Sequence, residues 1–199
     1  MQSCCANKGM ALSEEYFSIQ HRLAVNLIPL PEGSPLPDLD QLEAELPEPF
    51  RLSNSIAHLE AGSHRTLRSL SDELQPLVEI INQQSQKINV LLGFVLSLQD
   101  EACHRHHTER FGAGGLTLCS SLPLVPQQLV QLKIFLQEEA AAIFCYGRVT
   151  EVNPEGEQQR IQLAFAQIRD EDRELLIRAS LHVQSKQLKL RAQQRANSL

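Results

Sequence analysis

The chain has 199 residues, of which 42% are apolar and 21% are charged, and this is enough to bury one sizeable core. Its formal net charge of −6 provides no overall positive field for phosphates, so we expect no general binding to nucleic acid. No apolar run reaches the ~18 residues of a membrane span, so we expect no such span. The five cysteines are an odd number, and the first residues lack the basic and apolar regions of an export signal. These features predict reduced thiols and a cytoplasmic location.

The N-terminal part of the chain is predicted to contain one strand and a long connector. Residues 1–15 are expected to form a mobile leader, followed by one atypical domain over residues 16–199. Between residues 17 and 28 apolar side chains recur at alternate positions, which predicts a first β-strand. Six prolines between residues 29 and 50 indicate an extended connector, with one short helix around residues 39–46.

A helical period follows the connector and predicts an inserted helical region over about residues 63–101. From Leu67 to Leu98 the seam positions recur at steps of three and four through five heptads, and nine of the ten are apolar. Pro76 lacks a backbone donor, so we expect it either to kink this helix or to open its longer second half. An apolar seam of this length needs a partner, and strict heptads are typical of supercoiling with an equivalent helix.

The seam therefore predicts that copies of the chain assemble with one another. Ile81, Ile88 and Val95 at one seam position, with leucines at the other, are typical of two-stranded coiled coils. Further apolar side chains beside the seam widen the face, so we favour a tetramer and keep a dimer as the alternative. Gln84, the one polar seam residue, is either an edge glutamine or a buried amide that fixes the register. The predicted assembly residues are Leu74, Leu77, Ile81, Gln84, Ile88, Leu91, Val95 and Leu98.

Residues 111–168 change to a period of two, which predicts an antiparallel sheet that closes into a small barrel. A reverse turn is expected at residues 153–156. Acids at residues 170–172 and bases near the end match a helix dipole, so we expect a C-terminal helix over about residues 170–196. The expected strands cover residues 115–119, 131–136, 142–152 and 160–165.

Candidate chemical sites are few. Cys103, His104, His106 and His107 place four potential metal ligands within five residues, but their spacing matches no standard structural zinc pattern. We therefore expect a solvated helix end or loop at this position, and we expect neither a metal nor a cofactor. The sequence also lacks the common motifs of hydrolases and zinc proteases, so we expect no enzymatic activity.

A glycine-rich run at residues 112–115 lacks the Gly-Lys-Ser/Thr ending of a nucleotide-binding loop and leads into a strand. This run belongs to a series of motifs: Arg110 to Leu116, Leu122-Pro123-Leu124, Cys145 to Val149 and Ile168 to Arg178. In the order of these motifs the chain resembles the PilZ domain family over about residues 110–190, and the strand at residues 17–28 fits the first barrel strand of that family. The resemblance implies an α+β fold: a small antiparallel PilZ-like β-barrel, here with a long inserted coiled-coil-type helix, and a C-terminal helix.

Many PilZ domains are bacterial receptors for cyclic di-GMP, which they hold with an R-x-x-x-R pair and a D/N-x-S-x-x-G turn. In this sequence the turn falls on residues 110–115, where Arg110 replaces the acid or amide and Gly112 replaces the serine. Near the first strand Arg22 has no second arginine four residues away. Each lost charge-assisted hydrogen bond costs about 1.5–3 kcal/mol, so we expect weak or no binding of the dinucleotide. The residues that remain of this degenerate motif are Arg22, Arg110, Gly112, Gly114 and Gly115.

The sequence thus favours a non-enzymatic bacterial regulatory or scaffold protein that self-assembles through its heptad helix and acts on an unidentified protein partner. The alternative is a cyclic di-GMP receptor that binds the dinucleotide at an atypical site, built from Arg22, Arg110 and neighbouring backbone amides. A titration with the dinucleotide separates the two hypotheses.

Overall fold

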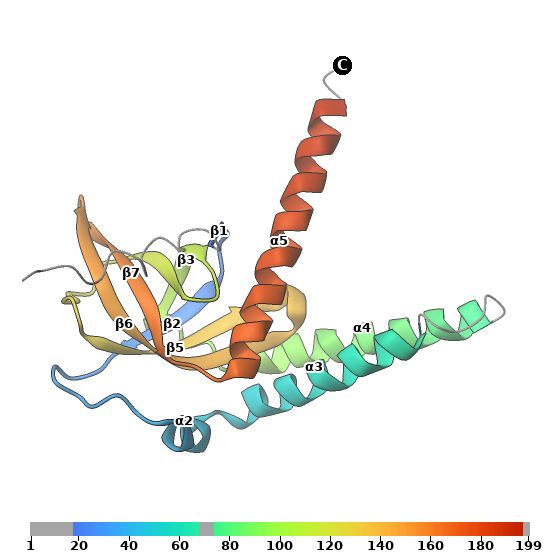
Figure 1. The fold of residues 1–199 in the computed structure, drawn as a ribbon, viewed down its shortest axis with the longest axis horizontal. Coiled ribbons are helices and arrows are strands. Elements are labelled where there is room, and N and C mark those ends of the chain that lie inside the picture. Colours follow the sequence, from blue (N-terminus) through green and yellow to red (C-terminus); the bar gives the residue numbers. More distant parts are fainter. Residues whose placement is uncertain (1–17, 68–73, 197–199) are drawn as a thin grey trace, which may run out of the picture.

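A β-barrel forms the centre of the computed structural model, and helices extend from it in two directions (Figure 1). The structure describes residues 18–67 and 74–196, so the leader predicted at residues 1–15 lies outside the described residues. The strands are β1 (Ile19–Gln20), β2 (Ala24–Pro29), β3 (Arg105–Phe111), β4 (Gly115–Ser120), β5 (Leu129–Leu136), β6 (Ala141–Glu155) and β7 (Gln158–Gln167). The helices are α2 (Leu39–Glu45), α3 (Glu48–Leu67), α4 (Gln75–Ser97) and α5 (Asp170–Ala196), with the short 3-10 helices η2 (Ala102–His104) and η3 (Gln137–Glu139).

Six antiparallel strands close the barrel. Their order is β3, β2, β5, β6, β7, β4, and pairing between β3 and β4 joins the two ends of the sheet. The predicted α+β fold, with a small barrel and a C-terminal helix, is therefore confirmed. The β6–β7 hairpin turns later than predicted, because Asn153 and Pro154 continue β6 in register with β7. The turn lies at Gly156, whose φ of +64° is in the left-handed region that glycine adopts without strain.

A bulge interrupts the first barrel strand. β1 and β2 pair with the same edge of β3, but the β1–β2 side holds one residue more over the same length. The Thr108 hydroxyl fills the gap, donating to the His21 carbonyl at 2.8 Å and accepting from the Leu23 amide at 2.9 Å. The single strand predicted over residues 17–28 is therefore two short strands, and Arg22 is exposed at the bulge between them.

Strand β3 corrects the helix end or loop predicted for the last three residues of 103–107, whereas residues 103 and 104 lie in the short helix η2. The first four residues of β3 alternate in burial, but the two less exposed ones, His106 and Thr108, are polar rather than apolar. His106 Nε2 lies 2.9 Å from the hydroxyl of Ser120 on β4, and Thr108 closes the bulge. Because hydrogen-bonded polar groups occupy this side of the strand, the apolar alternation that identifies a strand is missing.

The insertion between β2 and β3 contains a hairpin of two long helices rather than one. α4 begins at Gln75 with Pro76 in its first turn, so the proline opens the second half of the heptad region, as one of the two predicted alternatives requires. α3 lies beside α4 and begins at Glu48, where the sequence predicted an extended connector up to residue 50 (Figure 1). The predicted start of the helical region near residue 63 is therefore wrong, whereas α2 confirms the short helix expected within the connector.

Two hydrophobic cores hold these elements together. The first fills the barrel and is closed on one side by the N-terminal half of α5. The second lies between the outside of the barrel and the inserted helices. There Phe50 of α3 and Leu92 and Leu96 of α4 pack with Phe135 and Tyr146 of the sheet. The second core therefore fixes α3 and α4 against β5 and β6.

The point where the chain leaves α4 is anchored to the barrel by a buried amide. Asn26 of β2 is fully buried, and its Nδ2 donates to Asp100 Oδ1 at 2.8 Å and to the Glu101 carbonyl at 3.1 Å. Its Oδ1 accepts from the Glu101 amide at 2.9 Å. Asp100 in turn pairs with Arg105, and Glu101 pairs with Lys133. One side chain thus determines where the insertion returns to the barrel.

Replacing Asn26 with alanine is expected to lower the free energy of unfolding by about 2–4 kcal/mol, because the change removes three hydrogen bonds from a buried position. Urea denaturation followed by circular dichroism, at one protein concentration, measures the loss. The matched control is Asn153→Ala, whose exposed side chain donates to Glu151 and should change stability by no more than about 0.5 kcal/mol. Equal losses from both variants would contradict an anchoring role for Asn26.

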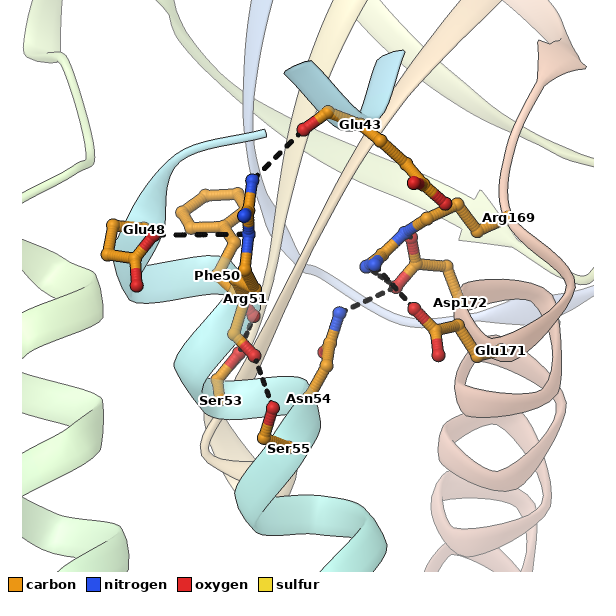
Figure 2. A network of polar contacts seen from close by, with 10 residues as sticks. All are labelled: Glu43, Glu48, Phe50, Arg51, Ser53, Asn54, Ser55, Arg169, Glu171 and Asp172. Atoms are coloured by element: carbon orange, nitrogen blue, oxygen red, sulfur yellow. Dashed lines mark hydrogen bonds and ion pairs between the residues drawn. The ribbon is translucent and has the colours of Figure 1, made fainter. Parts of the chain in front are cut away.

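A polar network joins α3 to the start of α5 (Figure 2). Asp172 is fully buried and accepts two hydrogen bonds from Arg169, at 2.8 and 3.0 Å. Asn54 of α3 donates to the same carboxylate at 3.1 Å, and Arg169 also pairs with Glu171. The network therefore fixes the inserted helices relative to the C-terminal helix.

Candidate functional site

The predicted seam of α4 lies on the surface of the chain. All eight predicted assembly residues are exposed, and the seven apolar ones expose between 37% and 66% of their area. The buried side chains of α4 are instead Leu92 and Leu96, which belong to the second core. Within the part of the chain that the structure describes, the seam is therefore left without a cover.

A second stripe on α4 explains how this helix packs on its own chain without using the seam. The stripe also follows steps of three and four, but it begins one residue later, so its face is turned by about 100° from the seam. At its C-terminal end Leu92 and Leu96 pack with Phe50 of α3. The seam consequently points away from that core. The less exposed residues of this stripe are Val78, Asn82, Ser85, Asn89, Leu92 and Leu96.

Further apolar side chains extend the exposed face of α4 beyond the seam. Ile80, Val90 and Phe94 are 55%, 73% and 64% exposed. A large apolar side chain contributes about 1.5–3 kcal/mol when it is fully buried, so a whole face left in water forfeits considerable stability. Apolar surface of this extent marks an interaction site. The exposed face of α4 is the strongest candidate for contact with another molecule.

The glycine-rich run of the degenerate motif forms the tight turn between β3 and β4. The Gly112 amide donates to the Gly115 carbonyl at 3.0 Å, so it is already engaged within the turn. The Gly114 carbonyl accepts from the amide of Phe165, and the Ala113 carbonyl accepts from Arg173 at 2.6 Å. A Cβ at Gly115 would lie 2.0 Å from a carbonyl oxygen of β7, so close strand packing alone requires this glycine. The turn therefore has a structural role without a ligand.

The two arginines of the degenerate motif have different surroundings. Arg110 is exposed on β3, opposite Gln20 of β1 and Thr117 of β4. Arg22 lies at the bulge and lines a cavity of about 320 Å³ between the barrel and α5. The fold thus brings Arg110 together with the glycine turn and places Arg22 in a separate cavity, which we call the Arg22 cavity.

Residues from separate parts of the chain surround the Arg22 cavity. His21 and His107 come from the barrel, and Glu138 and Glu139 come from η3. Sequence analysis missed His21, Glu138 and Glu139 and considered His107 only as a potential metal ligand, because no motif unites the four and only the fold brings them together. Apolar side chains complete the lining: Leu23, Ala24, Phe111, Phe135, Ala179 and Val183.

The charges in the Arg22 cavity oppose one another. Burial, together with the positive charge of Arg22, lowers the pKa of His107. The hydrogen bond from Lys186 lowers the pKa of Glu138, so this carboxyl is ionised at neutral pH. A carboxylate in the cavity that Arg22 lines disfavours a phosphodiester there, although Lys186 pairs with it at 2.6 Å and offsets part of its charge.

The cysteine and histidine cluster is divided by the fold. Cys103 and His104 lie near Glu101, with potential ligand atoms within 4.8 Å of one another, but the Glu101 carboxylate already contacts Lys133 at 2.5 Å. The other two histidines of the cluster continue into β3, where neighbouring side chains point to opposite faces. The four ligands that are adjacent in sequence are therefore not gathered around one point.

A second group of potential ligands lies on the outside of the barrel, where Glu109 and Glu155 flank the thiol of Cys119. Arg160 contacts both carboxylates, at 2.9 and 3.2 Å, and so balances part of their charge. Burial and the two neighbouring carboxylates raise the pKa of Cys119 to about 11. The thiol is therefore protonated at neutral pH and is neither a strong ligand nor a nucleophile.

Comparison with known proteins identifies the fold. The family model described as the PilZ domain matches residues 81–182, just over half of the chain. Among solved structures, a tetrameric PilZ domain protein from Xanthomonas campestris, described as self-assembled via an unusual helical bundle, is similar with a TM-score of 0.55. It is 14% identical, and the alignment covers 92% of this chain and 99% of that chain. The similarity extends over the inserted helices as well as the barrel.

Two further solved structures align with less than half of the chain. The Bacillus subtilis inhibitor of motility MotI/DgrA is 22% identical over 41% of this chain and 42% of its own, with a TM-score of 0.38. YcgR from Escherichia coli, in complex with c-di-GMP, is 13% identical over 47% of this chain and 39% of its own, with a TM-score of 0.35. The comparison with curated proteins gave no match. None of the described helices is long and apolar enough to cross a bilayer.

Proposed function

Because this chain belongs to the PilZ domain family, we propose that it is a non-enzymatic regulatory or scaffold protein that self-assembles through α4 and acts by binding a protein partner. The observation that carries the proposal is the exposed apolar seam from Leu74 to Leu98, which the described part of the chain leaves uncovered. Assembly would bury this seam and present several barrels at once. The partner protein is a separate molecule that the barrels would bind.

The number of copies follows from the width of the apolar face. A two-stranded coiled coil buries a narrow stripe, whereas the exposed apolar face of α4 also includes Ile80, Val90 and Phe94. A wider face is buried when each α4 contacts the α4 helices of two other copies, and this favours four copies of the chain over two. The helical bundle described for the tetrameric protein from Xanthomonas campestris supports the same arrangement. We therefore favour a tetramer over a dimer.

Light scattering of the purified protein tests the assembly. A tetramer of 22.3 kDa chains has a mass of about 89 kDa, and this mass is expected at micromolar concentration. A mass of about 45 kDa would support the seam but replace the tetramer with the dimer. A single chain in dilute solution would contradict the proposal, and the seam variant described in the Discussion shows which surface is responsible.

We further propose that the chain binds cyclic di-GMP weakly or not at all. Three observations support this: the Gly112 amide is engaged in its turn, Arg110 replaces an acid or amide, and an ionised Glu138 lines the same cavity as Arg22. Two or three missing charge-assisted hydrogen bonds weaken binding about a thousandfold or more. The alternative, a receptor with an atypical site, would use Arg22 and Arg110.

Isothermal titration calorimetry with cyclic di-GMP separates these alternatives. We expect no saturable heat up to about 100 μM ligand, because too few charged donors remain to hold the phosphates. The titration is repeated with Arg22→Ala and with Arg110→Ala, as a control for which arginine is responsible for any heat. Binding at micromolar or lower concentration that either variant abolishes would establish the atypical receptor instead.

The organisation and location of the chain are also proposals. We propose one domain over residues 16–199, because the second core joins the inserted helices to the barrel and Asn54 joins α3 to α5. We propose a cytoplasmic protein, because Cys103, Cys119 and Cys145 are all free thiols. Removal of residues 48–98 should then expose Phe135 and Phe144 and destabilise the barrel.

A further inference from the structure

The distal half of α5, residues 184–195, extends beyond the body of the protein. The last buried residue of the helix is Val183, and residues 184–195 are all exposed except residue 187, which is partly buried. In Figure 1 this half of α5 rises away from both the barrel and the α3–α4 hairpin. At 1.5 Å per residue it extends roughly 18 Å. It therefore makes few contacts with the described part of its own chain.

This distal half is strongly basic. It contains four cations and no acid, so its net charge is +4 in a chain whose overall charge is −6. Lys186 pairs with Glu138 at 2.6 Å. Among the described residues, no carboxylate forms an ion pair with Lys189, Arg191 or Arg195. Three positive charges are thus available for a contact outside the chain.

The outward face of α5 also carries apolar side chains. Ile177, Leu181 and Leu188 are 42%, 58% and 58% exposed, and they are spaced by four and seven residues on one side of the helix. The buried side chains of α5, such as Leu176 and Val183, lie on the opposite side. A helical segment as short as this distal half is marginally stable in water without tertiary contacts. A surface that combines carboxylates with apolar groups would stabilise it.

The same chain has a surface with the complementary composition. Residues 36–51, which we call the acidic segment, include α2 and hold five acids and one arginine, a net charge of −4. Asp40 and Glu43 project from α2 as exposed carboxylates, and no ion pair of either occurs among the described residues. Leu36 and Leu39 beside them are 37% and 48% exposed. The acidic segment therefore combines free carboxylates with exposed leucines.

The two surfaces do not meet within one molecule. Figure 1 places α2 on one side of the barrel and the distal half of α5 on the other. We infer that the distal half of α5 in one copy docks on the acidic segment of a second copy, pairing Lys189 and Arg191 with Asp40 and Glu43. The three cations of the distal half that have no ion pair among the described residues would face a segment whose net charge is −4, and the leucines of each segment are covered in the same contact.

This contact is independent of the proposed assembly through α4. It uses no seam residue, and the two surfaces belong to different faces of the chain. Because its charges lie at the surface, the contact weakens at high ionic strength, where the screening length falls to a few ångströms. The apolar seam lacks this salt dependence, so the two contacts are distinguishable in one preparation.

Carbodiimide crosslinking tests the inference directly, because it joins an amine and a carboxylate only where they are in contact. The full chain is prepared in ¹⁴N and ¹⁵N forms, the forms are mixed at equal concentration, and crosslinked peptides are identified by mass spectrometry. We expect peptides that join Lys189 to Asp40 or Glu43 and that contain one copy of each isotope. Their yield should fall at least tenfold between 50 and 500 mM salt. Absence of mixed-isotope peptides between these segments would overturn the inference.

Charge reversal provides a second, independent test. Lys189→Glu/Arg191→Glu and Asp40→Lys/Glu43→Lys should each abolish crosslinks between these segments, whereas mixing the two variants should restore peptides that join one variant to the other. The matched control is Arg178→Glu, an exposed cation in the N-terminal half of α5, which should leave the yield within twofold. Failure of the mixture to restore crosslinks would overturn the inference. So would binding of the wild-type chain to phosphatidylglycerol vesicles without any such crosslink, since α5 would then recognise a membrane surface.

Discussion

Replacing Ile81 and Ile88 together by aspartate is expected to dissociate the assembly into single chains of 22.3 kDa at about 500 mM salt, where the charged contact of α5 is screened as well. Both isoleucines lie on the seam, where assembly would take them out of water. A carboxylate in an apolar interface either remains ionised and unpaired or takes up a proton, and either outcome costs several kcal/mol. In a tetramer the cost is repeated in every helix. The variant should therefore remain dissociated at concentrations far above those at which the wild type assembles.

The single chain should survive this double substitution. Ile81 and Ile88 are already 37% and 48% exposed, and neither belongs to a hydrophobic core. Light scattering measures the mass, and circular dichroism should retain the signal of the barrel. The matched control is Gln75→Asp/Gln86→Asp, which adds the same charge at exposed positions of α4 on the side away from the seam and should keep the assembled mass. If the isoleucine variant also keeps that mass, the seam is not the interface.

The sequence predicted most of the barrel strands and the helices α4 and α5, because apolar or charged side chains recur in each of them at a regular spacing. In β5 the inward side chains Leu132, Ile134 and Leu136 alternate with polar or less buried ones, as a half-buried strand requires. In α4 the seam repeats through the whole helix, and Pro76 marks its start. In α5 three acids begin the helix and bases end it. Local pattern and final structure agree in these elements because each one carries a regular spacing of apolar or charged side chains.

The elements that were missed carry weaker patterns. α3 includes Pro49 and buries polar residues such as Ser53 and Asn54, so its buried face does not read as an apolar stripe. β3 places His106 and Thr108 where apolar residues are expected. In both elements a hydrogen bond replaces an apolar contact, and the partner that makes burial favourable is far away in sequence. Asn54 and Asp172 are 118 residues apart.

The candidate functional residues also fall into a group that the sequence could predict and a group that it could not. The seam could be predicted because all its residues lie on one helix and repeat at a fixed spacing. The Arg22 cavity could not, because His21, His107 and Glu138 have no spacing that identifies them. The degenerate motif lay between these cases. Its glycines lie on the turn between β3 and β4 beside Arg110, whereas Arg22 lies in a separate cavity, and sequence alone did not reveal that Gly115 is required by the approach of β7.

The buried polar network of Arg169, Asp172 and Asn54 joins the inserted helices to α5 (Figure 2). Burial raises the pKa of Asp172, against the opposing effect of the hydrogen bonds and charge of Arg169. The carboxylate is therefore costly to hold ionised, and the guanidinium is what compensates for that cost. Removing one partner of such a pair is more damaging than removing both.

Arg169→Met is accordingly expected to lower the free energy of unfolding by about 3–5 kcal/mol, because Asp172 then lacks its cation in a fully buried position. Arg169→Met/Asp172→Leu should recover most of this loss, since no buried charge remains. Urea denaturation measures both variants. The matched control is Arg51→Met, which removes an exposed arginine paired with Glu48 at 3.9 Å and should cost no more than about 1 kcal/mol.

The response to pH distinguishes a lost charge partner from simple loss of packing in the Arg169→Met variant. An acid whose pKa is raised by folding binds its proton more tightly in the folded state. Stability is then lost as the pH rises from the unfolded value near 3.9 through the raised pKa of Asp172. Without Arg169 that pKa should rise further, so the variant should lose more stability than the wild type between pH 5 and pH 8. A constant difference between the two across this range would show that Arg169 contributes packing alone, and that the link between α3 and α5 does not depend on its charge.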